Sequence, residues 1–353
     1  MNQTITYTNP HSSFKLEGVF YDKTGLSYLA ERLISEGESY QVSLGHFIQQ
    51  WIDSSPEINL QTSGSTGTPK TILMSKQAMV NSAITTGNYF KLKPGDSALS
   101  CLPFEYIAAK MMFVRAYVLG LEMDCVNPSS KPLKDLKRSY DFCAMVPIQL
   151  ENSIEYLHHI KTIIVGGAKV SKGLISKLVN SASTIYETFG MTETVSHIAV
   201  KNISKSKDAF EVLPSVSIGV DTRNCLFIKA PHIISTLIQT NDVVNLTSKT
   251  AFEWIGRFDT IINSGGIKIA PEQLEHQLEG FIKERFFIAS QKNNSLGEIV
   301  IIVIERSIPY KNLSFDALEP IKRPKHTYYV DAIKETVSGK IKRQETLDLV
   351  ILE

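Results

Sequence analysis

Short apolar runs alternate with longer amphipathic stretches along most of the chain. Runs of β-type composition predict strands over 97–102, 141–146, 161–165 and 298–305. Apolar residues at helical spacing predict helices over 75–90, 106–119, 148–159 and 271–286. Pro271, followed by Glu272 and Glu275, suits a helix start, because proline fits the first helical position and carboxylates are favoured at the positive end of the helix dipole. The alternation indicates an α/β protein.

The composition is that of an ordinary globular protein with one large domain or two. Of the 353 residues, 43% are hydrophobic and 21% are charged, which argues against long disorder and disulfide-dense miniproteins. Lys and Arg total 37 against 36 Asp and Glu, so the formal net charge is +1. We therefore expect no nucleic-acid partner and no insertion into a membrane, since both call for a stronger electrostatic or apolar signature.

Cysteine and histidine spacing argues against disulfides and against a metal cluster. The four cysteines form no CxxC pair and lie mostly in apolar surroundings, so they are predicted to be reduced and buried: Cys101, Cys125, Cys143 and Cys225. The eight histidines show no HExxH-type spacing. The first dozen residues lack both the basic and the apolar part of a signal peptide, so a cytoplasmic location is expected.

The most informative stretch is 61–71, QTSGSTGTPKT. Its small residues let the backbone approach phosphate oxygens, its hydroxyls add donors, and its lysine adds a cation. It is not a Walker A loop, because Pro69 stands where that loop needs glycine. A flexible surface linker is the alternative, but proline and lysine leading into a helix are not linker composition. We predict phosphate contacts from Thr62, Ser63, Gly64, Ser65, Thr66, Gly67 and Lys70.

A second stretch, 186–194 (YETFGMTET), combines an aromatic ring, a glycine, a hydroxyl and a carboxylate. Phe189 offers a face for a base or for packing, Thr192 a hydroxyl for phosphate, and Glu193 an oxygen ligand for Mg²⁺. The alternative is a plain helix start, in which Thr192 caps the helix and Glu193 lies at the dipole. By itself this stretch does not decide between the two.

Together the two stretches resemble motifs of the adenylate-forming superfamily of acyl-CoA synthetases, luciferases and peptide-synthetase adenylation domains, which read TSGSTGTPK and YGMTE. Further along, 240–242 (TND) looks like the family's TGD, 256–275 like its hinge motif, and 338–343 (SGKIKR) like its final lysine motif. All five motifs occur in the family's order. Phe189 replaces the usual Tyr and Asn241 the usual Gly, but no charged catalytic group is lost.

The resemblance implies an α/β fold with two domains. A large N-terminal domain with β-sheets and flanking helices would span 1–258 and bind AMP and the acyl substrate. A small, mobile α+β domain would span 259–353 and carry the catalytic lysine. The phosphate loop begins at residue 62, much nearer the N-terminus than in most superfamily members, so part of the usual first subdomain is expected to be absent or reduced.

The resemblance also implies a two-step reaction. A carboxylate attacks the α-phosphate of ATP to give an acyl-adenylate and pyrophosphate, and the acyl group then passes to the thiol of CoA. Lys340 would stabilise the charge that builds on the reacting oxygens, and Thr192 and Glu193 would act beside it, Glu193 as a Mg²⁺ ligand. Asp259 would be the hinge of the mobile domain. A structural turn or an ion pair with Arg257 is the alternative role for Asp259, and a solvated lysine the alternative for Lys340.

The remaining implied contacts follow the motifs residue by residue. Nucleotide contacts beyond the phosphate loop are implied for Gly167, Ala168, Glu187, Phe189, Gly190, Thr192, Asp242 and Arg257. Acyl-substrate contacts are implied for Tyr106, Lys110, Arg115, Gly166 and Gly190. The CoA side would include Gly265, Gly266 and Lys268. For Asp242, which would bind the ribose hydroxyls, an ordinary turn aspartate is the alternative.

The run 102–119 gives a more specific indication of the acid. It places Lys110 and Arg115 inside an otherwise apolar helix, which is costly unless the charges meet anions or the surface. Two cations suggest an acid with an extra carboxylate. This run, with TETVSH at 192–197, resembles the o-succinylbenzoate-CoA ligases of menaquinone biosynthesis, in which an arginine at the position of Arg115 is thought to face the substrate's carboxylates. The alternative for both cations is a side chain that extends along a half-exposed helix to reach water.

Two other functions stay open at this point. The enzyme class holds but the substrate changes if the chain activates another aryl or fatty acid, or loads a carrier protein. A non-catalytic nucleotide-binding relic of the fold is the alternative from another class. The retained Lys70, Glu193, Asp242 and Lys340 argue against a relic. The expected partners are therefore a small carboxylic acid, ATP and CoA, with a homo-oligomer left open.

Overall fold

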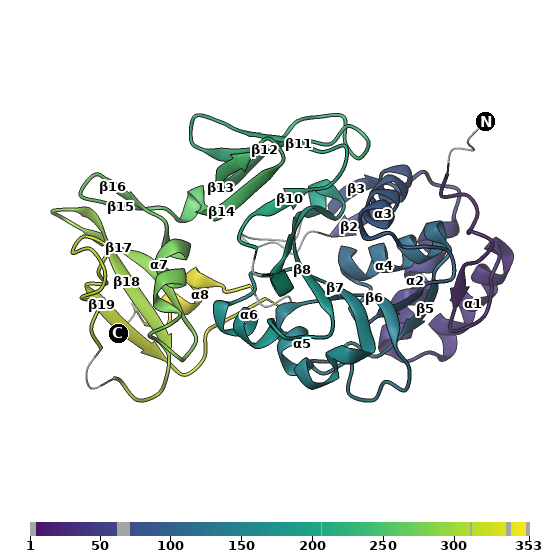
Figure 1. Cartoon of the computed structure of the whole chain (residues 1–353), viewed down its shortest axis with the longest axis horizontal. Coiled ribbons are helices and arrows are strands. Elements are labelled where there is room, and N and C mark those ends of the chain that lie inside the picture. Colours follow the sequence, from purple (N-terminus) through teal and green to yellow (C-terminus); the bar gives the residue numbers. More distant parts are fainter. Residues whose placement is uncertain (1–4, 62–70, 206, 311–312, 337–339, 351–353) are drawn as a thin grey trace. The chain divides into compact units, whose positions relative to one another are not determined.

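The computed structural model describes residues 5–61, 71–205, 207–310, 313–336 and 340–350, and it divides into two compact units (Figure 1). Unit 1 comprises Met1–Val170, Lys177–Ser217 and Lys229–Ile238. Unit 2 comprises Ser171–Ser176, Ile218–Ile228 and Gln239–Glu353. The division of the chain at residues 258 and 259 stays a prediction.

Unit 1 is built on a sheet with strand order β1-β5-β4-β6-β7-β8-β9-β10. Neighbours from β1 to β8 are parallel, whereas β8, β9 and β10 are antiparallel. The strands are β1 (Lys15–Leu16), β4 (Ser97–Ser100), β5 (Glu122–Cys125), β6 (Tyr140–Met145), β7 (Ile160–Val165), β8 (Thr184–Gly190), β9 (His197–Asn202) and β10 (Phe210–Val212). Parallel strands joined by helices confirm the predicted α/β class.

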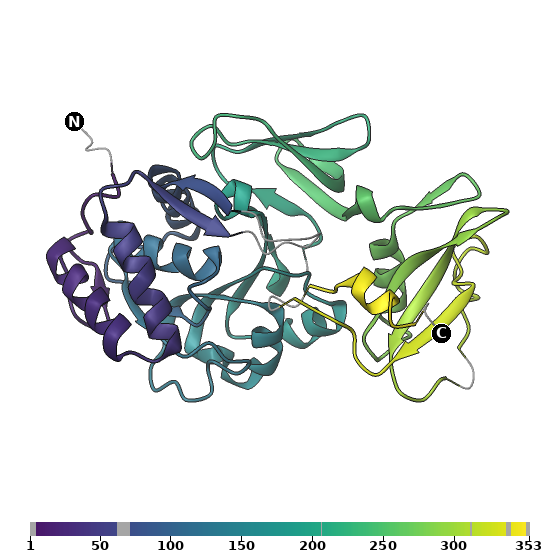
Figure 2. The same cartoon turned by 180° about the vertical axis from the view of Figure 1, so that it is seen from behind.

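The helices of this part of the chain begin and end at recognisable signals. Asp22 caps α1 by accepting a hydrogen bond from the Gly25 N–H at 2.7 Å, and Ser75 caps α3 in the same way. The helix α4 ends at Gly120, whose φ of 75° suits glycine. The helices are α1 (Lys23–Glu36), α2 (Ser39–Ile52), α3 (Lys76–Phe90), α4 (Ile107–Leu119) and α5 (Pro147–Asn152), and α1 and α2 lie side by side (Figure 2). A sixth helix, α6 (Lys172–Leu178), belongs for the most part to unit 2. None of those in the described part of the chain combines the length and the apolar character needed to cross a membrane.

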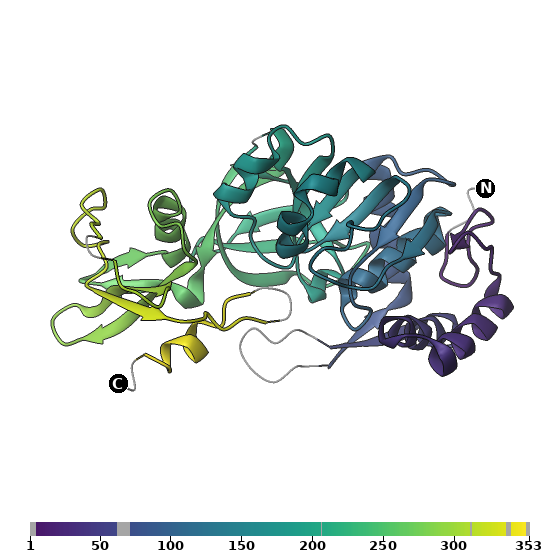
Figure 3. The ribbon, with the colours of Figure 1, turned by 90° about the horizontal axis from the view of Figure 1, so that it is seen from below.

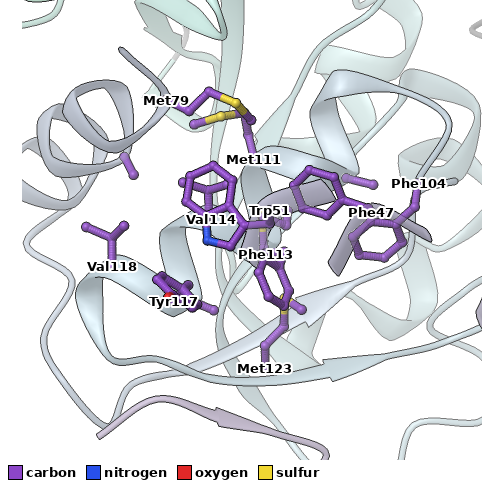
Figure 4. Close-up of a cluster of buried hydrophobic side chains, with 14 of the residues drawn as sticks. Phe47, Trp51, Met79, Phe104, Met111, Phe113, Val114, Tyr117, Val118 and Met123 are labelled. Carbon is purple, nitrogen blue, oxygen red and sulfur yellow. The ribbon is translucent and has the colours of Figure 1, made fainter. Parts of the chain in front are cut away.

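The core of unit 1 surrounds α4, which is apolar on nearly every side. Figure 4 shows its side chains among those of α2 and α3. Phe113 packs edge-on against Phe47, with ring centroids 5.6 Å apart, and Tyr117 packs edge-on against Trp51 at 5.8 Å. Because α4 is buried on all sides, its two cations, Lys110 and Arg115, are also buried.

A separate two-stranded hairpin flanks the predicted phosphate loop. Strands β2 (Glu57–Gln61) and β3 (Thr71–Ser75) pair antiparallel, from Glu57 opposite Ser75 to Gln61 opposite Thr71. The predicted phosphate contacts Thr62, Ser63, Gly64, Ser65, Thr66, Gly67 and Lys70 lie outside the described residues, so their roles stay predictions.

Unit 2 contains an antiparallel ribbon and a five-stranded sheet. The ribbon has the order β14-β13-β12-β11, formed by β11 (Ser217–Val220), β12 (Cys225–Lys229), β13 (Ile238–Ser248) and β14 (Ala251–Arg257). The second sheet has the order β16-β15-β18-β17, with β19 paired parallel to β18. Its strands are β15 (Ile262–Ser264), β16 (Ile267–Ile269), β17 (Phe286–Asn293), β18 (Gly297–Glu305) and β19 (His326–Val330).

Two helices cover opposite faces of this sheet: α7 (Pro271–Leu278) and α8 (Arg343–Leu347) (Figure 3). Successive side chains of β18 point to opposite faces of the sheet. Val300, Ile302 and Ile304 pack with Leu274 of α7, whereas Ile301 and Val303 pack with Leu347 of α8. The run at 298–305 is therefore a strand, as predicted, and the structure shows that it is buried on both faces.

Two predicted helices were too long. The segment 148–159 is α5 followed by a separate 3₁₀ helix, Ile154–His159, because the backbone of Ser153 leaves the helical region. The segment 271–286 is helical only to Leu278, and Phe286 already belongs to β17, which pairs along its full length with β18. The four cysteines are free thiols, as expected, but Cys125, the last residue of β5, is partly exposed rather than buried.

Candidate active site

The carboxyl ends of the parallel strands gather the predicted residues of unit 1 at one edge of the sheet. Strands β4, β6, β7 and β8 are parallel neighbours, so their carboxyl ends lie together. Tyr106 follows β4 and precedes α4, 166–168 follow β7, and 191–193 follow β8, which ends at Gly190. Open parallel sheets bind their ligands at this edge. The geometry therefore brings Tyr106, 166–168 and 190–193 to the edge at which such a fold binds ligands, and their contacts with a ligand stay predictions.

The loop after β7 depends on two glycines. A Cβ on Gly166 would lie 2.5 Å from the hydroxyl of Thr188, which donates a hydrogen bond to the Val165 carbonyl at 3.0 Å. Gly167 has a φ of 90°, a left-handed conformation that side chains rarely adopt. The backbone of this loop is thus exposed beside β8 without a side chain in the way, as a close approach by a ligand requires.

Glu187 anchors that same loop from inside the sheet. Its carboxylate is 4% exposed, forms an ion pair with Lys201 Nζ at 2.7 Å, and accepts a hydrogen bond from the Val170 N–H at 3.1 Å. The ion pair spans β8 and β9, where the two residues are directly opposite. Glu187 therefore holds 166–170 against the strand ends, and its contact with a nucleotide stays a prediction.

The chain turns sharply after β8. Gly190 leaves no room for a Cβ, because the Ser196 carbonyl and the backbone of His197 lie against it. Thr192–Thr194 form a short 3₁₀ helix, in which the Thr194 hydroxyl accepts from the Met191 N–H at 2.9 Å and donates to the Ser196 carbonyl at 2.8 Å. The buried member of this turn is Thr194, which leaves Glu193 exposed.

An exposed lone carboxylate fits a magnesium ion that a nucleotide brings with it. Mg²⁺ in such sites uses one or two carboxylates, phosphate oxygens and water rather than an all-protein cage. The described part of the chain holds no group of three or more His, Cys, Asp or Glu side chains able to bind a metal. Glu193 fits that kind of site, and its role as a ligand stays a prediction.

The backbone of Val195 is strained. Its φ of 66° and ψ of −51° form a γ-turn of the rare positive-φ kind, closed by a hydrogen bond from the Ser196 N–H to the Thr194 carbonyl at 2.7 Å. A β-branched residue in this region costs about 1–3 kcal/mol and persists only where the surroundings impose it. The Val195 side chain is fully buried, and the turn directs the hydroxyl of Ser196 toward α4.

Arg115 receives that hydroxyl. The guanidinium is 2% exposed, and its Nη2 donates to Ser196 Oγ at 2.9 Å, while Nη1 lies 3.7 Å from the Met112 sulfur. Its Nε is buried without a partner, and among the described residues no carboxylate forms an ion pair with it. Burial lowers the pKa of Arg115 to about 9. The cation is thus held by neutral groups and lacks an anion.

His197 lies beside this cation. Burial, and then the charge of Arg115, place the pKa of His197 well below its usual range, so the ring is neutral. Its Nε2 is 3.4 Å from the Thr86 hydroxyl and its Nδ1 is 3.4 Å from Ser196 Oγ. A neutral imidazole therefore completes the wall around Arg115 without adding a second charge.

Lys110 has different neighbours. Five positions along a helix correspond to a rotation of about 140°, so Lys110 and Arg115 point to different sides of α4. The ammonium of Lys110 lies 5.7 Å from the centre of the Phe47 ring on α2. Burial lowers the pKa of Lys110, and the charge of Glu105 partly opposes that effect. The structure does not bring the two predicted substrate cations together.

In unit 2, Asp242 lies within β13 rather than in a turn. It is 7% exposed, is directly opposite Arg257 on β14, and accepts a hydrogen bond from the Trp254 indole at 2.9 Å through Oδ1. Burial raises the pKa of Asp242, while Trp254, Arg257 and Lys340 act in the other direction. The second carboxylate oxygen makes no hydrogen bond within the described residues. A buried acceptor of this kind fits a hydroxyl donor such as a ribose diol.

The predicted hinge carries an ion pair. Arg257 donates to both oxygens of Asp259, from Nε at 2.9 Å and from Nη2 at 2.8 Å, and this pairing lowers the pKa of Asp259. The ion pair was one of the roles left open for Asp259. Between these two residues, Phe258 lies under the guanidinium of Arg223 at 4.9 Å and the ammonium of Lys268 at 5.8 Å.

Gly265 and Gly266 form the two-residue turn of the hairpin β15–β16. Their φ values are 55° and 82°, as a tight hairpin turn requires, and Lys268 follows on β16. The backbone of Lys340 pairs with Thr336, whose hydroxyl accepts from the Lys340 N–H at 3.0 Å and whose N–H donates to the Lys340 carbonyl at 2.9 Å. The Lys340 charge is near enough to Asp242 to help lower the pKa of that carboxyl.

A model of the family described as "AMP-binding enzyme" matches residues 48–225, just over half of the chain. The chain belongs to this AMP-binding enzyme family. A solved structure similar to this chain is that of an acyl-CoA synthetase (AMP-forming)/AMP-acid ligase II-like protein from Dyadobacter fermentans. The two chains are 32% identical, the match covers 92% of this chain and 98% of the Dyadobacter chain, and the TM-score is 0.62.

Curated relatives of this AMP-binding enzyme include 2-succinylbenzoate–CoA ligases. The protein of that name from Lactococcus lactis is 23% identical over 321 residues, which cover 83% of this chain and 71% of the relative. The Haemophilus influenzae protein is 24% identical over 317 residues, or 81% of this chain and 69% of the relative. The O-succinylbenzoate coenzyme A synthetase of Bacillus subtilis, solved in complex with ATP and magnesium ion, shares the fold at a TM-score of 0.72 and 18% identity, covering 82% of this chain and 69% of that one. These comparisons confirm the resemblance and the fold inferred from the motifs.

Sequence reasoning missed four residues that the structure places against the predicted site. Lys201 pairs with Glu187, Trp254 donates to Asp242, and Ser196 and His197 surround Arg115. Ser196 and His197 belong to the stretch 192–197, whose resemblance to o-succinylbenzoate-CoA ligases gave neither residue a role. Lys201 and Trp254 depend on the register of β9 and β14, for which the sequence offered no signal.

Proposed function

We propose that this AMP-binding enzyme is an ATP-dependent acid–thiol ligase that converts 2-succinylbenzoate, ATP and CoA to 2-succinylbenzoyl-CoA, AMP and pyrophosphate. The step belongs to menaquinone biosynthesis. The named relatives support the choice of reaction, and the family membership supports its ligase chemistry.

The observation that carries the choice of acid is the buried guanidinium of Arg115. A cation buried without an anion is unfavourable, and a carboxylate is the partner that a guanidinium binds best. 2-Succinylbenzoate has two carboxylates, so one can react while the other pairs with Arg115 and accepts from Ser196. An acid with a single carboxylate would leave Arg115 unpaired.

The residues of this chain then take the following roles in the first step. A carboxylate oxygen of the acid attacks the α-phosphorus of ATP, the bond to the bridging oxygen breaks, and pyrophosphate leaves. Lys340 stabilises the negative charge on the attacking and α-phosphate oxygens. Asp242 accepts hydrogen bonds from the ribose, beside Arg257, and the backbone at 166–168 borders the adenine and acyl groups. Mg²⁺ on Glu193 would neutralise phosphate charge.

In the second step the CoA thiol loses its proton and attacks the acyl carbon, and AMP leaves. The hinge at Asp259 lets the C-terminal part of the chain exchange Lys340 for the CoA side, where Gly265, Gly266 and Lys268 lie on one hairpin. The ion pair of Asp259 with Arg257 has to rearrange if this segment rotates.

Pyrophosphate release with ATP and Mg²⁺ tests the proposal across 2-succinylbenzoate, benzoate, a medium-chain fatty acid and acetate, each with and without CoA. Turnover confined to 2-succinylbenzoate plus CoA, with the thioester found by mass, is the expected result. Pyrophosphate release with a different acid would support the ligase chemistry and reject 2-succinylbenzoate as the substrate. No release from a folded, ATP-binding protein would reject all four acids as substrates and favour a non-catalytic relic.

A further inference from the structure

A hollow of about 190 Å³ lies on unit 1 between α2 and the start of α4. At about 30 Å³ per water molecule, this is room for roughly six waters. A carboxylate or phosphate group with a few further atoms fits this volume, whereas a nucleotide does not. The lining residues are Ser43, His46, Phe47, Gln50, Phe104, Glu105 and Lys110.

The unusual member of the lining is Lys110. It is 8% exposed, and its ammonium makes no ion pair or hydrogen bond with any described residue, only the contact with the Phe47 ring at 5.7 Å. Lys76 shows how the same unit treats its other buried lysine. It is fully buried, lies 5.7 Å from the Tyr7 ring, and in addition pairs with the Asp53 carboxylate at 2.7 Å. Lys110 has the aromatic contact and lacks the anion.

Glu105 lies in the same wall but does not serve as that anion. Its carboxylate accepts a hydrogen bond from the Ser43 hydroxyl and forms no ion pair with Lys110. Its negative charge acts on Lys110 from a distance and favours the charged form of the amine. Burial lowers the pKa of Lys110, and the charge of Glu105 partly opposes that effect, while the side chain of Lys110 lines the hollow without an anion among the described residues.

The other groups around the hollow favour an anion. On α2, Ser43, His46 and Gln50 lie three and four positions apart, so they share one face of the helix. The imidazole of His46 and the amide of Gln50 are exposed and can donate hydrogen bonds. The helix α4 begins at the edge of the hollow, and its N-cap residue Tyr106 makes no side-chain hydrogen bond to the first turn. The positive end of that helix thus adds to the potential at Lys110.

We propose that this hollow is a second oxyanion site, distinct from the one at Arg115, which binds a single small carboxylate or phosphate group against Lys110. His46 and Gln50 donate to the same group from α2. Glu105 at the rim makes the site unfavourable for polyanions. The two oxyanion sites are separate, because Lys110 and Arg115 lie on different sides of α4.

Calorimetric titration of the full chain with acetate and with inorganic phosphate, at constant ionic strength, tests the proposal. Saturable binding of one or both anions is expected, and the two titrations distinguish a carboxylate ligand from a phosphate ligand. Lys110→Met should weaken the binding at least tenfold. Arg115→Met should leave the binding component that depends on Lys110 unchanged. Equal binding by Lys110→Met and the natural chain, or no saturable binding of either anion, overturns the proposal.

A charge substitution provides a second test that does not empty the core. Gln50→Glu places a carboxylate at the exposed edge of the hollow, where it can pair with Lys110, and should abolish the binding. Gln49→Glu makes the same charge change on the neighbouring, exposed position of α2 outside the lining and should bind as the natural chain does. Equal loss in both variants would show a general charge effect, and equal retention in both would also reject the site.

Discussion

Arg115 and Ser196 join helix α4 to the turn that follows β8, through a hydrogen bond of 2.9 Å from the guanidinium to the hydroxyl. Eighty-one positions of sequence separate them. The strained γ-turn at Val195 sets the direction of the hydroxyl, so strain in one segment serves to place a polar group beside a buried cation in another. This pair is the basis of the proposed recognition of a second carboxylate.

Replacing Arg115 by Met is expected to raise the KM for 2-succinylbenzoate by about 30- to 1000-fold, equivalent to roughly 2–4 kcal/mol. The KM for ATP should change less than twofold, because the contact proposed for the guanidinium is with the acid and not with the nucleotide. Steady-state kinetics with each substrate varied in turn measure both values. Arg32→Met, at an exposed position of α1, is the matched control. An unchanged KM for the acid would remove Arg115 from its pocket.

The same substitution should stabilise the ligand-free protein. Arg115 is buried with an unsatisfied Nε and no carboxylate among the described residues, and replacing a buried charge by an apolar residue of similar length stabilises by about 1–4 kcal/mol. Calorimetric unfolding without ligand should therefore give a higher Tm for Arg115→Met. A lower Tm would mean that an anion already compensates the charge in the free protein.

Lys340→Ala is expected to separate the two half-reactions. Formation of the acyl-adenylate should fall by at least 100-fold, because a charge that acts in the transition state is lost. Thioester formation from a supplied acyl-adenylate should change little. Lys342→Ala, two positions along the same segment, is the matched control, and its Nζ pairs with the nearby Glu345 at 2.9 Å. Equal loss of both half-reactions would contradict the two-conformation account.

Arg343 fixes the segment that carries Lys340 to helix α7. Its Nη2 lies 2.6 Å from Glu275 and 3.8 Å from Glu272, and both carboxylates are largely buried. Glu275→Gln should therefore destabilise unit 2 by about 2–3 kcal/mol, measured by amide hydrogen exchange in β17 and β18. Adding Arg343→Met should recover part of the loss, since the unpaired cation is removed. Additive losses in this cycle would mean that the two residues do not interact.

Asp242→Asn should make the ligand-free protein more stable at neutral pH and weaken nucleotide binding at least tenfold. Burial raises the pKa of Asp242 above its usual 3.8, so the folded chain binds this proton more tightly than the unfolded chain does. The contribution of Asp242 to the free energy of unfolding therefore falls as the pH rises from about 3.8 through the higher pKa of the folded state. The Tm advantage of Asp242→Asn should be smallest near pH 4 and largest at pH 7. An advantage that is constant across pH would exclude the titration of Asp242 as its cause.

The sequence predicted the strands at 97–102, 141–146 and 161–165 and the helices at 75–90 and 106–119, because short apolar runs and helical spacing are local properties. It failed at the ends of 148–159 and 271–286. There, a break at Ser153 and the pairing of β17 with β18 decide where the helix ends, and neither follows from local propensity.

For the site, the sequence determined which kinds of residue are present. The order and spacing of its glycines, hydroxyls, carboxylates and lysines were enough to identify the family. Only the tertiary structure decided which of them meet. It placed Lys110 against α2 and Arg115 against Ser196, and it gave Asp242 its partner in Trp254. The physical reason is that helix rotation and strand register set which side chains face one another, and both are fixed by packing between segments far apart in the chain.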